Sequence, residues 1–165
     1  MLASRLIKRY NTLTMKFKEN KMSVTTEMLA ETLRLHKLWQ TESDGRRADL
    51  SNADLFRADL HGANLSGANL SGAVLIGAEL TGANLTCADL LGADLFRAVL
   101  IDAVLIDAVL LGADLRGANL FRADLSNADL RGADMTGANL SRADLSGACR
   151  YCANLSGAVL DGATL

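Results

Sequence analysis

Acidic side chains at a fixed spacing are the first residues of this chain that could do chemistry. Ten aspartates stand directly before a leucine or methionine, in register with a five-residue spacing, as at Asp94, Asp114 and Asp134. Clustered carboxylates can serve acid–base catalysis or bind calcium. No calcium-loop pattern or acid pair stands apart from this spacing, however. We therefore expect the aspartates to hydrogen bond to nearby backbone turns.

Cysteine and histidine predict neither a metal site nor a redox centre. Cys149 and Cys152 form one C-x-x-C pair without a second pair or a nearby histidine, which argues against zinc. With Cys87 they make no disulfide framework, so a reducing cytoplasm is the expected location. His36 and His61 lie far apart, and the glycines follow the repeat rather than a phosphate-binding loop. We predict no catalytic residue, no cofactor and no metal: the protein is not expected to be an enzyme.

The charge divides the chain into a basic leader and an acidic body. Residues 1–47 hold ten basic and five acidic side chains, whereas residues 48–165 hold seven arginines and fourteen acids. No run of 18 uncharged apolar residues occurs, so no membrane span is predicted. We expect a basic flexible segment at 1–22, for which organelle or lumenal targeting stays open, and a helical cap and linker at 23–47.

A strict repeat of five residues organises the rest of the chain. From Ala48 to Ala163 every fifth residue is alanine, 24 times, and leucine stands two residues later in 22 cases. This period fits neither a single helix nor a flat strand, so both residues must point inward on a coiled path. Leucine supplies bulk and alanine a small neighbour, so a narrow core closes without voids. We call the residue before each leucine the pre-leucine position, and the two after it the first and second turn positions.

The second turn position predicts the shape of the corners. It holds glycine in 13 of 23 repeats, which suits the positive φ of a type II turn. A bulky residue at positive φ is costly, so different turn types are expected where arginine or aspartate replaces glycine. These corners are at Arg57, Arg97, Asp102, Asp107, Arg122 and Arg142.

The string ADLSNADLFRADLHGANLSGANLSGA, which begins at Ala48, resembles the pentapeptide repeat family and its pattern A(D/N)LXX. The resemblance extends unbroken over residues 48–165. It implies an all-β solenoid, a right-handed quadrilateral β-helix with four pentapeptides per coil and hence about six coils. Residues twenty apart would then stack in columns.

An N-terminal α-helical cap is expected before the repeats. Thr25 or Thr26 can begin a helix, and Gly45 follows it. Solenoid ends need a cover, and the HKLW stretch also resembles N-terminal caps of this family. We predict that a helix around residues 26–40 packs on the first coil through Leu35, Leu38 and Trp39.

Apolar residues gather on the outside of the middle coils. Three successive pre-leucine positions hold Val99, Val104 and Val109, where most others hold Asp or Asn. Valine is a good strand former, so an ordinary surface remains one interpretation. The alternative is an interaction surface, because so many apolar side chains at one height exceed the patch usual on monomers. The predicted surface comprises Phe56, Ile76, Phe96, Val99, Ile101, Val104, Ile106, Val109, Leu111 and Phe121.

The C-terminal repeats form a second candidate surface, around Arg150, Tyr151 and Leu165. Arg150 occupies an inward leucine position, where a buried unpaired guanidinium would be too costly, so we expect it to lean out through the open end. An uncovered coil favours association, and a symmetric dimer is its commonest outcome. We predict a homodimer through this end or through residues 96–111.

Two functions compete. The first is a non-catalytic protein-interaction or structural module, whose protein partner the sequence does not identify. The second is DNA mimicry, because the quinolone-resistance members of the family that this chain resembles protect DNA gyrase. Over ~28 Å of column, B-DNA would carry roughly 16 charges. The repeats carry a net −7, from fourteen acids and seven arginines, so mimicry is the weaker alternative, and no direct nucleic-acid binding is expected.

Overall fold

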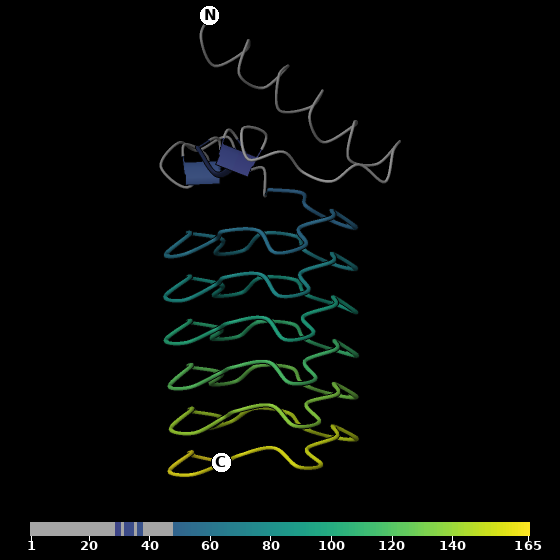
Figure 1. Ribbon diagram of the computed structural model, residues 1–165, viewed down its shortest axis with the longest axis vertical. Helices are drawn as coiled ribbons and strands as arrows, with labels where there is room; N and C mark the ends of the chain where they lie inside the picture. Colours follow the sequence, from purple (N-terminus) through teal and green to yellow (C-terminus); the bar gives the residue numbers. More distant parts are fainter. Residues whose placement is uncertain (1–28, 31, 35, 38–47) are drawn as a thin grey trace, which may run out of the picture.

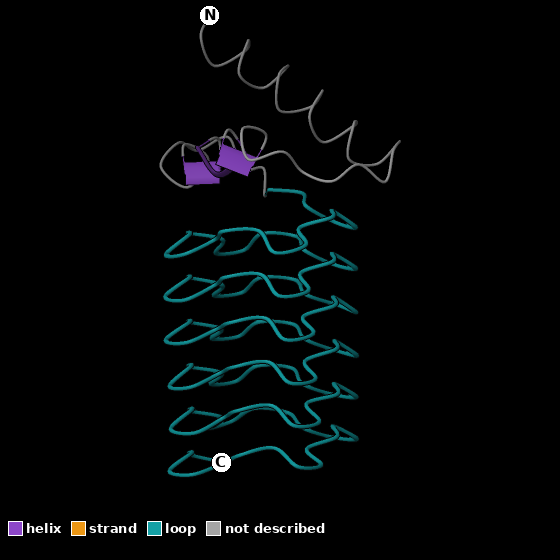
Figure 2. Cartoon of the chain, viewed as in Figure 1, coloured by secondary structure: helices purple, strands orange, loops and turns teal. Residues whose placement is uncertain are grey.

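The protein is a column of stacked coils with helical residues at one end and the C-terminus at the other (Figure 1). The computed structural model describes residues 29–30, 32–34, 36–37 and 48–165. Residues 29–30, 32–34 and 36–37 are helical. The described repeats contain no extended strand and appear as regular loops, because each pentapeptide contributes a single bridging residue (Figure 2).

Parallel β-bridges set the register of the coils. Asp49 bridges to Asn69, Asn69 bridges to Asp89, and every described bridge joins pre-leucine residues twenty apart. One coil is therefore four pentapeptides. The leucine and alanine columns face inward, and from Leu50 to Leu145 the leucine positions are fully buried. Met135 is buried as completely as the leucines.

Backbone hydrogen bonds connect each coil to the next. The amide of Leu50 donates to the carbonyl of Asn69 at 2.7 Å, and that of Asn52 to Ser71 at 2.8 Å. The amide of Ala53 closes the corner by donating to the carbonyl of Leu50 at 3.1 Å. The amide of Asn69 donates to the alanine one coil before it, at 2.8 Å. Four of the five amides in a pentapeptide thus have backbone acceptors, and only the amide of the first turn position remains.

Aspartate and asparagine supply the missing acceptor. All sixteen described Asp and Asn residues at pre-leucine positions accept the following first-turn amide through Oδ1, at 2.9–3.2 Å. Phe56, for example, donates to Asp54 at 3.1 Å. Such a bond contributes about 1 kcal/mol. The prediction that these side chains hydrogen bond to the backbone of the turns is confirmed.

The prediction of different turns at the bulky corners is wrong. Every described second turn position has a positive φ, and ten of these residues are not glycine. Arg57 has a φ of 53°, and Arg97, Asp102, Asp107, Arg122 and Arg142 lie between 54° and 59°. The reason is the ladder: the amide of Arg57 donates to the carbonyl of Ile76 at 2.9 Å. Another turn type would break this bond and disturb the stacking of the coil, whereas a left-handed residue costs only about 1–2 kcal/mol.

The helical residues contact the first coil through one side. Leu29 belongs to the same buried cluster as the repeat leucines, and Leu33 packs against it. Thr32 and His36 are also buried, which gives this side a helical spacing. The predicted contacts Leu35, Leu38 and Trp39 lie outside the described residues, as does the predicted basic segment 1–22.

Acid should weaken this end of the molecule through His36. Burial lowers the pKa of His36 below its ordinary 6.5, and a hydrogen bond with the backbone of Ser66 opposes the shift in part. A lowered folded-state pKa means that the neutral form stabilises the fold above the unfolded pKa, and that this stability is lost as the pH falls through the folded value. We expect the free energy of unfolding to fall more between about pH 7.5 and about pH 5 in the wild type than in His36→Gln. Urea titrations of both proteins at both pH values measure the free energies of unfolding. An equal fall in the two proteins would contradict the prediction.

Candidate interaction surface

The ten predicted surface residues do not form one patch. Each coil turns four corners, so residues five apart lie on adjacent faces and residues twenty apart stack on one face. We number the faces 1 to 4 by their first leucines, Leu50, Leu55, Leu60 and Leu65. Face 1 carries Val109 and Leu111, face 2 carries Phe56, Ile76 and Phe96, face 3 carries Val99, Ile101 and Phe121, and face 4 carries Val104 and Ile106.

The valine belt, which comprises Val99, Val104 and Val109, interrupts the side-chain hydrogen bonds of the turns. Valine has no acceptor, so within the described repeats no side chain accepts the amides of Ile101, Ile106 and Leu111. These three amides follow one another along the chain on three successive corners. The belt therefore gives up three hydrogen bonds, each worth about 1 kcal/mol.

No apolar neighbour within the belt's columns compensates for this loss. Val99 bridges to Glu79 and Asn119, one coil to each side. Val109 likewise stands between Asp89 and Asp129. The valines do not stack on other valines or leucines of the surface, so the fold itself gains little apolar burial from them.

Face 1 holds an open apolar part of the surface, to which Leu91, outside the predicted set, contributes. Val109 is 36% exposed and Leu91 is 45% exposed. Leu91 stands one coil before Leu111 at the same first turn position. Together Leu91, Val109 and Leu111 form an apolar patch that one partner can contact without turning a corner.

Arginines cover two of the predicted phenylalanines. The guanidinium of Arg97 lies 5.0 Å from the ring centre of Phe96, and that of Arg116 lies 5.6 Å from it. On face 3, the ring of Phe121 has Arg122 at 5.3 Å and Arg142 at 5.8 Å.

Among the residues that the structure describes, Phe56 has only Arg57 over it, at 5.0 Å, and it is 53% exposed. The sequence prediction omitted these arginines. The signal was present in the string Leu-Phe-Arg-Ala, which occurs three times.

Three arginines are held by carboxylates, and two of them, Arg116 and Arg122, also lie over a phenylalanine ring. Arg116 pairs with Asp114 through both Nε and Nη2, and Arg131 pairs with Asp129 in the same way. In each case the hydrogen bond from arginine is the main cause of a lowered pKa of the aspartate. These pairs lie at the surface, where water and salt screen the attraction, so they contribute little to stability.

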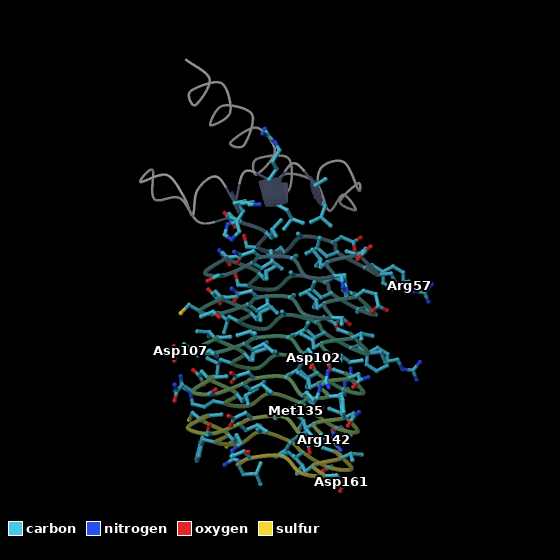
Figure 3. All side chains as sticks on the ribbon, turned by 90° about the vertical axis from the view of Figure 1, so that its left-hand side faces the viewer. Arg57, Asp102, Asp107, Met135, Arg142 and Asp161 are labelled. Carbon is cyan, nitrogen blue, oxygen red and sulfur yellow. The ribbon has the colours of Figure 1, made fainter. Side chains whose placement is uncertain are left out.

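Asp102 and Arg122 form a pair of a different kind, because it joins two successive coils. Arg122 Nε donates to Asp102 at 2.7 Å. This bond is the main cause of the lowered pKa of Asp102. The negative charge of Asp102 is therefore matched within the column, whereas Asp107, at the opposite side of the view in Figure 3 from Arg57, makes no ion pair among the described residues.

The C-terminal coil is more open than the coils before it. Arg150 is half-buried at its leucine position, while Tyr151 and Leu165 are exposed. Cys149 and Cys152 are exposed free thiols. The described residues hold no group of three or more potential metal ligands, and none of their helices is long and apolar enough to cross a membrane.

Comparisons with known proteins agree with the repeat architecture. A family model described as pentapeptide repeats (8 copies) matches residues 41–72, 63–100, 98–137 and 138–165. No curated protein matches the chain at a significant level. The segments that the family model matches together cover more than half of the chain.

Solved structures show similar proteins. One is a pentapeptide repeat protein from the thylakoid lumen of Arabidopsis thaliana, with 36% identity over 59% of this chain and 65% of that one, at a TM-score of 0.35. Another is HetL, a pentapeptide repeat protein involved in heterocyst differentiation regulation in the cyanobacterium Nostoc, with 35% identity over 73% of this chain and 71% of that one, at a TM-score of 0.29.

A third is QnrB1, a plasmid-mediated fluoroquinolone resistance protein, with 22% identity over 71% of this chain and 72% of that one, at a TM-score of 0.50. This last likeness bears on the fold alone, a right-handed β-helical solenoid. The chain spans 65% of the length of the Arabidopsis protein.

Proposed function

Because the chain belongs to the pentapeptide repeat family, we propose that it is a non-catalytic protein-interaction or structural module whose partner binds at the valine belt. In this proposal the repeats form about six coils, and the helical segment around Leu29 caps the first of them. The column is a rigid support, and the identity of the partner depends on the side chains that it displays.

One observation carries the proposal. Every described Asp or Asn at a pre-leucine position bonds the turn amide that follows it, as Asp94 and Asp114 do immediately before and after the belt. Three consecutive repeats give up this bond for partly exposed valines that stack on polar residues. A local rule broken without internal compensation is typical of a functional site, and burial against a partner would supply the missing stabilisation.

Restoring the turn hydrogen bonds should therefore keep or raise the stability of the protein while it removes binding of the partner. In the triple variant Val99→Asn/Val104→Asn/Val109→Asn, each asparagine can accept the amide two residues later without adding charge. We expect the free energy of unfolding to stay level or rise, by up to about 1 kcal/mol per site, since the loss of strand propensity offsets part of the gain. We also expect capture of the native partner to be lost.

The control is Val74→Asn/Val159→Asn, which makes the same change outside the belt. Urea unfolding measures stability, and quantitative pull-down from the native source measures capture. Light scattering of both variants shows whether the partner is a second copy, as in the predicted homodimer, for which the end around Arg150, Tyr151 and Leu165 is the other proposed contact. Unchanged capture by the triple variant would contradict the proposal.

DNA mimicry is the second candidate function. The observation in its favour is the stack of Asp94, Asp114 and Asp134 on face 2. Against it, Arg116 neutralises Asp114, and the other two carboxylates accept turn amides. A supercoiling assay with DNA gyrase and ciprofloxacin separates the two candidates: protection of gyrase would favour mimicry.

A further inference from the structure

Apolar side chains lie beside two cationic ones at the corner between faces 2 and 3. Phe56, Ile76 and Phe96 occupy successive first turn positions, and Arg57, Gly77 and Arg97 follow them at the second. We call these six residues the Phe–Arg ridge. It is distinct from the valine belt, and Figure 3 shows Arg57 extending from the side of the column.

The two guanidiniums of the ridge are held in one orientation. Arg57 and Arg97 each lie 5.0 Å from the ring centre of the preceding phenylalanine. The stem of Arg57 runs beside Gly77, where an added Cβ would lie 3.5 Å from its Cγ. Two coils separate the arginines, which places them about 10 Å apart along the column. Gly77 adds no side chain between them.

The hydrogen-bond donors of these arginines are available to a ligand. Arg116, Arg122 and Arg131 each bind an aspartate. Across the part of the chain that the structure describes, neither Arg57 nor Arg97 makes an ion pair, and both are exposed. A guanidinium stacked on a ring keeps its N–H groups at its edge, where they can bind a carboxylate in a bidentate manner.

The surroundings indicate the chemistry of the partner. Phe56 is 53% exposed and lies beside a cation. A ligand that combines apolar groups with negative charge therefore matches the ridge. The repeats as a whole carry fourteen acids and seven arginines, a net −7 that repels a continuous polyanion such as nucleic acid much more than a short segment with few carboxylates. Carboxylates interspersed with apolar side chains satisfy both conditions.

We propose that the Phe–Arg ridge is a docking surface for an acidic segment of a partner protein. Carboxylates of the segment pair with Arg57 and Arg97, and its apolar side chains cover Phe56 and Ile76. This surface goes beyond the proposed function of the belt, and each can fail without the other, because the belt variants leave all six residues of the ridge intact.

Fluorescence anisotropy with defined probes tests the proposal. The probe is a fluorescein-labelled peptide of about ten residues that alternates glutamate and leucine. We expect it to bind the full chain, to bind more weakly in high salt, and to lose about fivefold or more in affinity for Arg57→Gln/Arg97→Gln. A peptide with glutamine in place of glutamate should bind poorly.

The matched control is Arg122→Gln/Arg131→Gln, which makes the same change in net charge at two arginines that already bind aspartate. It should change the affinity less than about twofold. An equal loss of affinity in the control would mean that only the overall charge of the protein matters, and it would overturn the proposal. No binding of the glutamate peptide, or tighter binding of a single-stranded DNA oligonucleotide, would overturn it as well. Circular dichroism of both double variants checks that the column is retained.

Discussion

Replacing Leu110 by arginine is expected to unfold the column, whereas replacing Arg150 by leucine is expected to stabilise it. Both positions belong to one inward column on face 1, with Leu130 between them. Leu110 is fully buried, so a guanidinium there has neither water nor a carboxylate within the core. Desolvating such a charge costs several kcal/mol, comparable with the whole stability of a small domain.

Arg150 avoids this cost because it lies half-buried in the last coil. Leucine there would add partial apolar burial against Leu130 and is expected to raise the free energy of unfolding by about 1 kcal/mol. Thermal unfolding followed by circular dichroism measures both variants. The control is Leu110→Met, which should cost less than about 1.5 kcal/mol, since Met135 fills an equivalent position in the native core. A folded Leu110→Arg protein with near-native stability would refute this account of the core.

Replacing Gly147 by alanine should destabilise the protein more than the same change at Gly132. Both glycines have a positive φ, near 70° and 65° respectively, so both variants bear a similar backbone cost of about 1 kcal/mol. At Gly147 an added Cβ would also collide with Oδ1 of Asn127, one coil before, whereas at Gly132 nothing lies within 4 Å. Displacing the asparagine should add about 1 kcal/mol.

A double variant isolates the collision. Asn127→Gly/Gly147→Ala removes the side chain that the new methyl group meets, so its loss of stability should be smaller than the sum of the two single changes. Chemical denaturation of the four proteins completes the cycle, with Gly132→Ala as the reference for the backbone cost alone. Equal losses at Gly147 and Gly132 would show that the Asn127 side chain moves aside without cost and would contradict this prediction.

The five-residue period, and the inward direction of its alanines and leucines, were predictable from the sequence because the information is local. Each pentapeptide repeats the same inward alanine and leucine, and no partner distant in the chain is needed to recognise this pattern. The use of aspartate in turns follows from the same local register, and sixteen repeats confirm it. Leu35, Leu38 and Trp39 stay predictions.

Only the tertiary structure decided the features that depend on contacts with the neighbouring coils: the backbone conformation at the corners, the face on which each side chain lies, and the partners of the arginines. Local preference argued against a left-handed Arg57, yet its amide donates to the carbonyl of Ile76, nineteen residues later, and this ladder outweighs the preference of one residue. Stacking likewise divides the apolar residues among four faces, so Val99 and Val109 point in different directions although they are ten apart in sequence. Arg122 pairs with an aspartate and also lies over a phenylalanine, whereas Arg57 lies over a phenylalanine without an aspartate partner, although the side chain is the same. Only the neighbours that the coils bring beside them, Asp102 beside Arg122 or the open corner beside Arg57, determine which donors remain available to a partner.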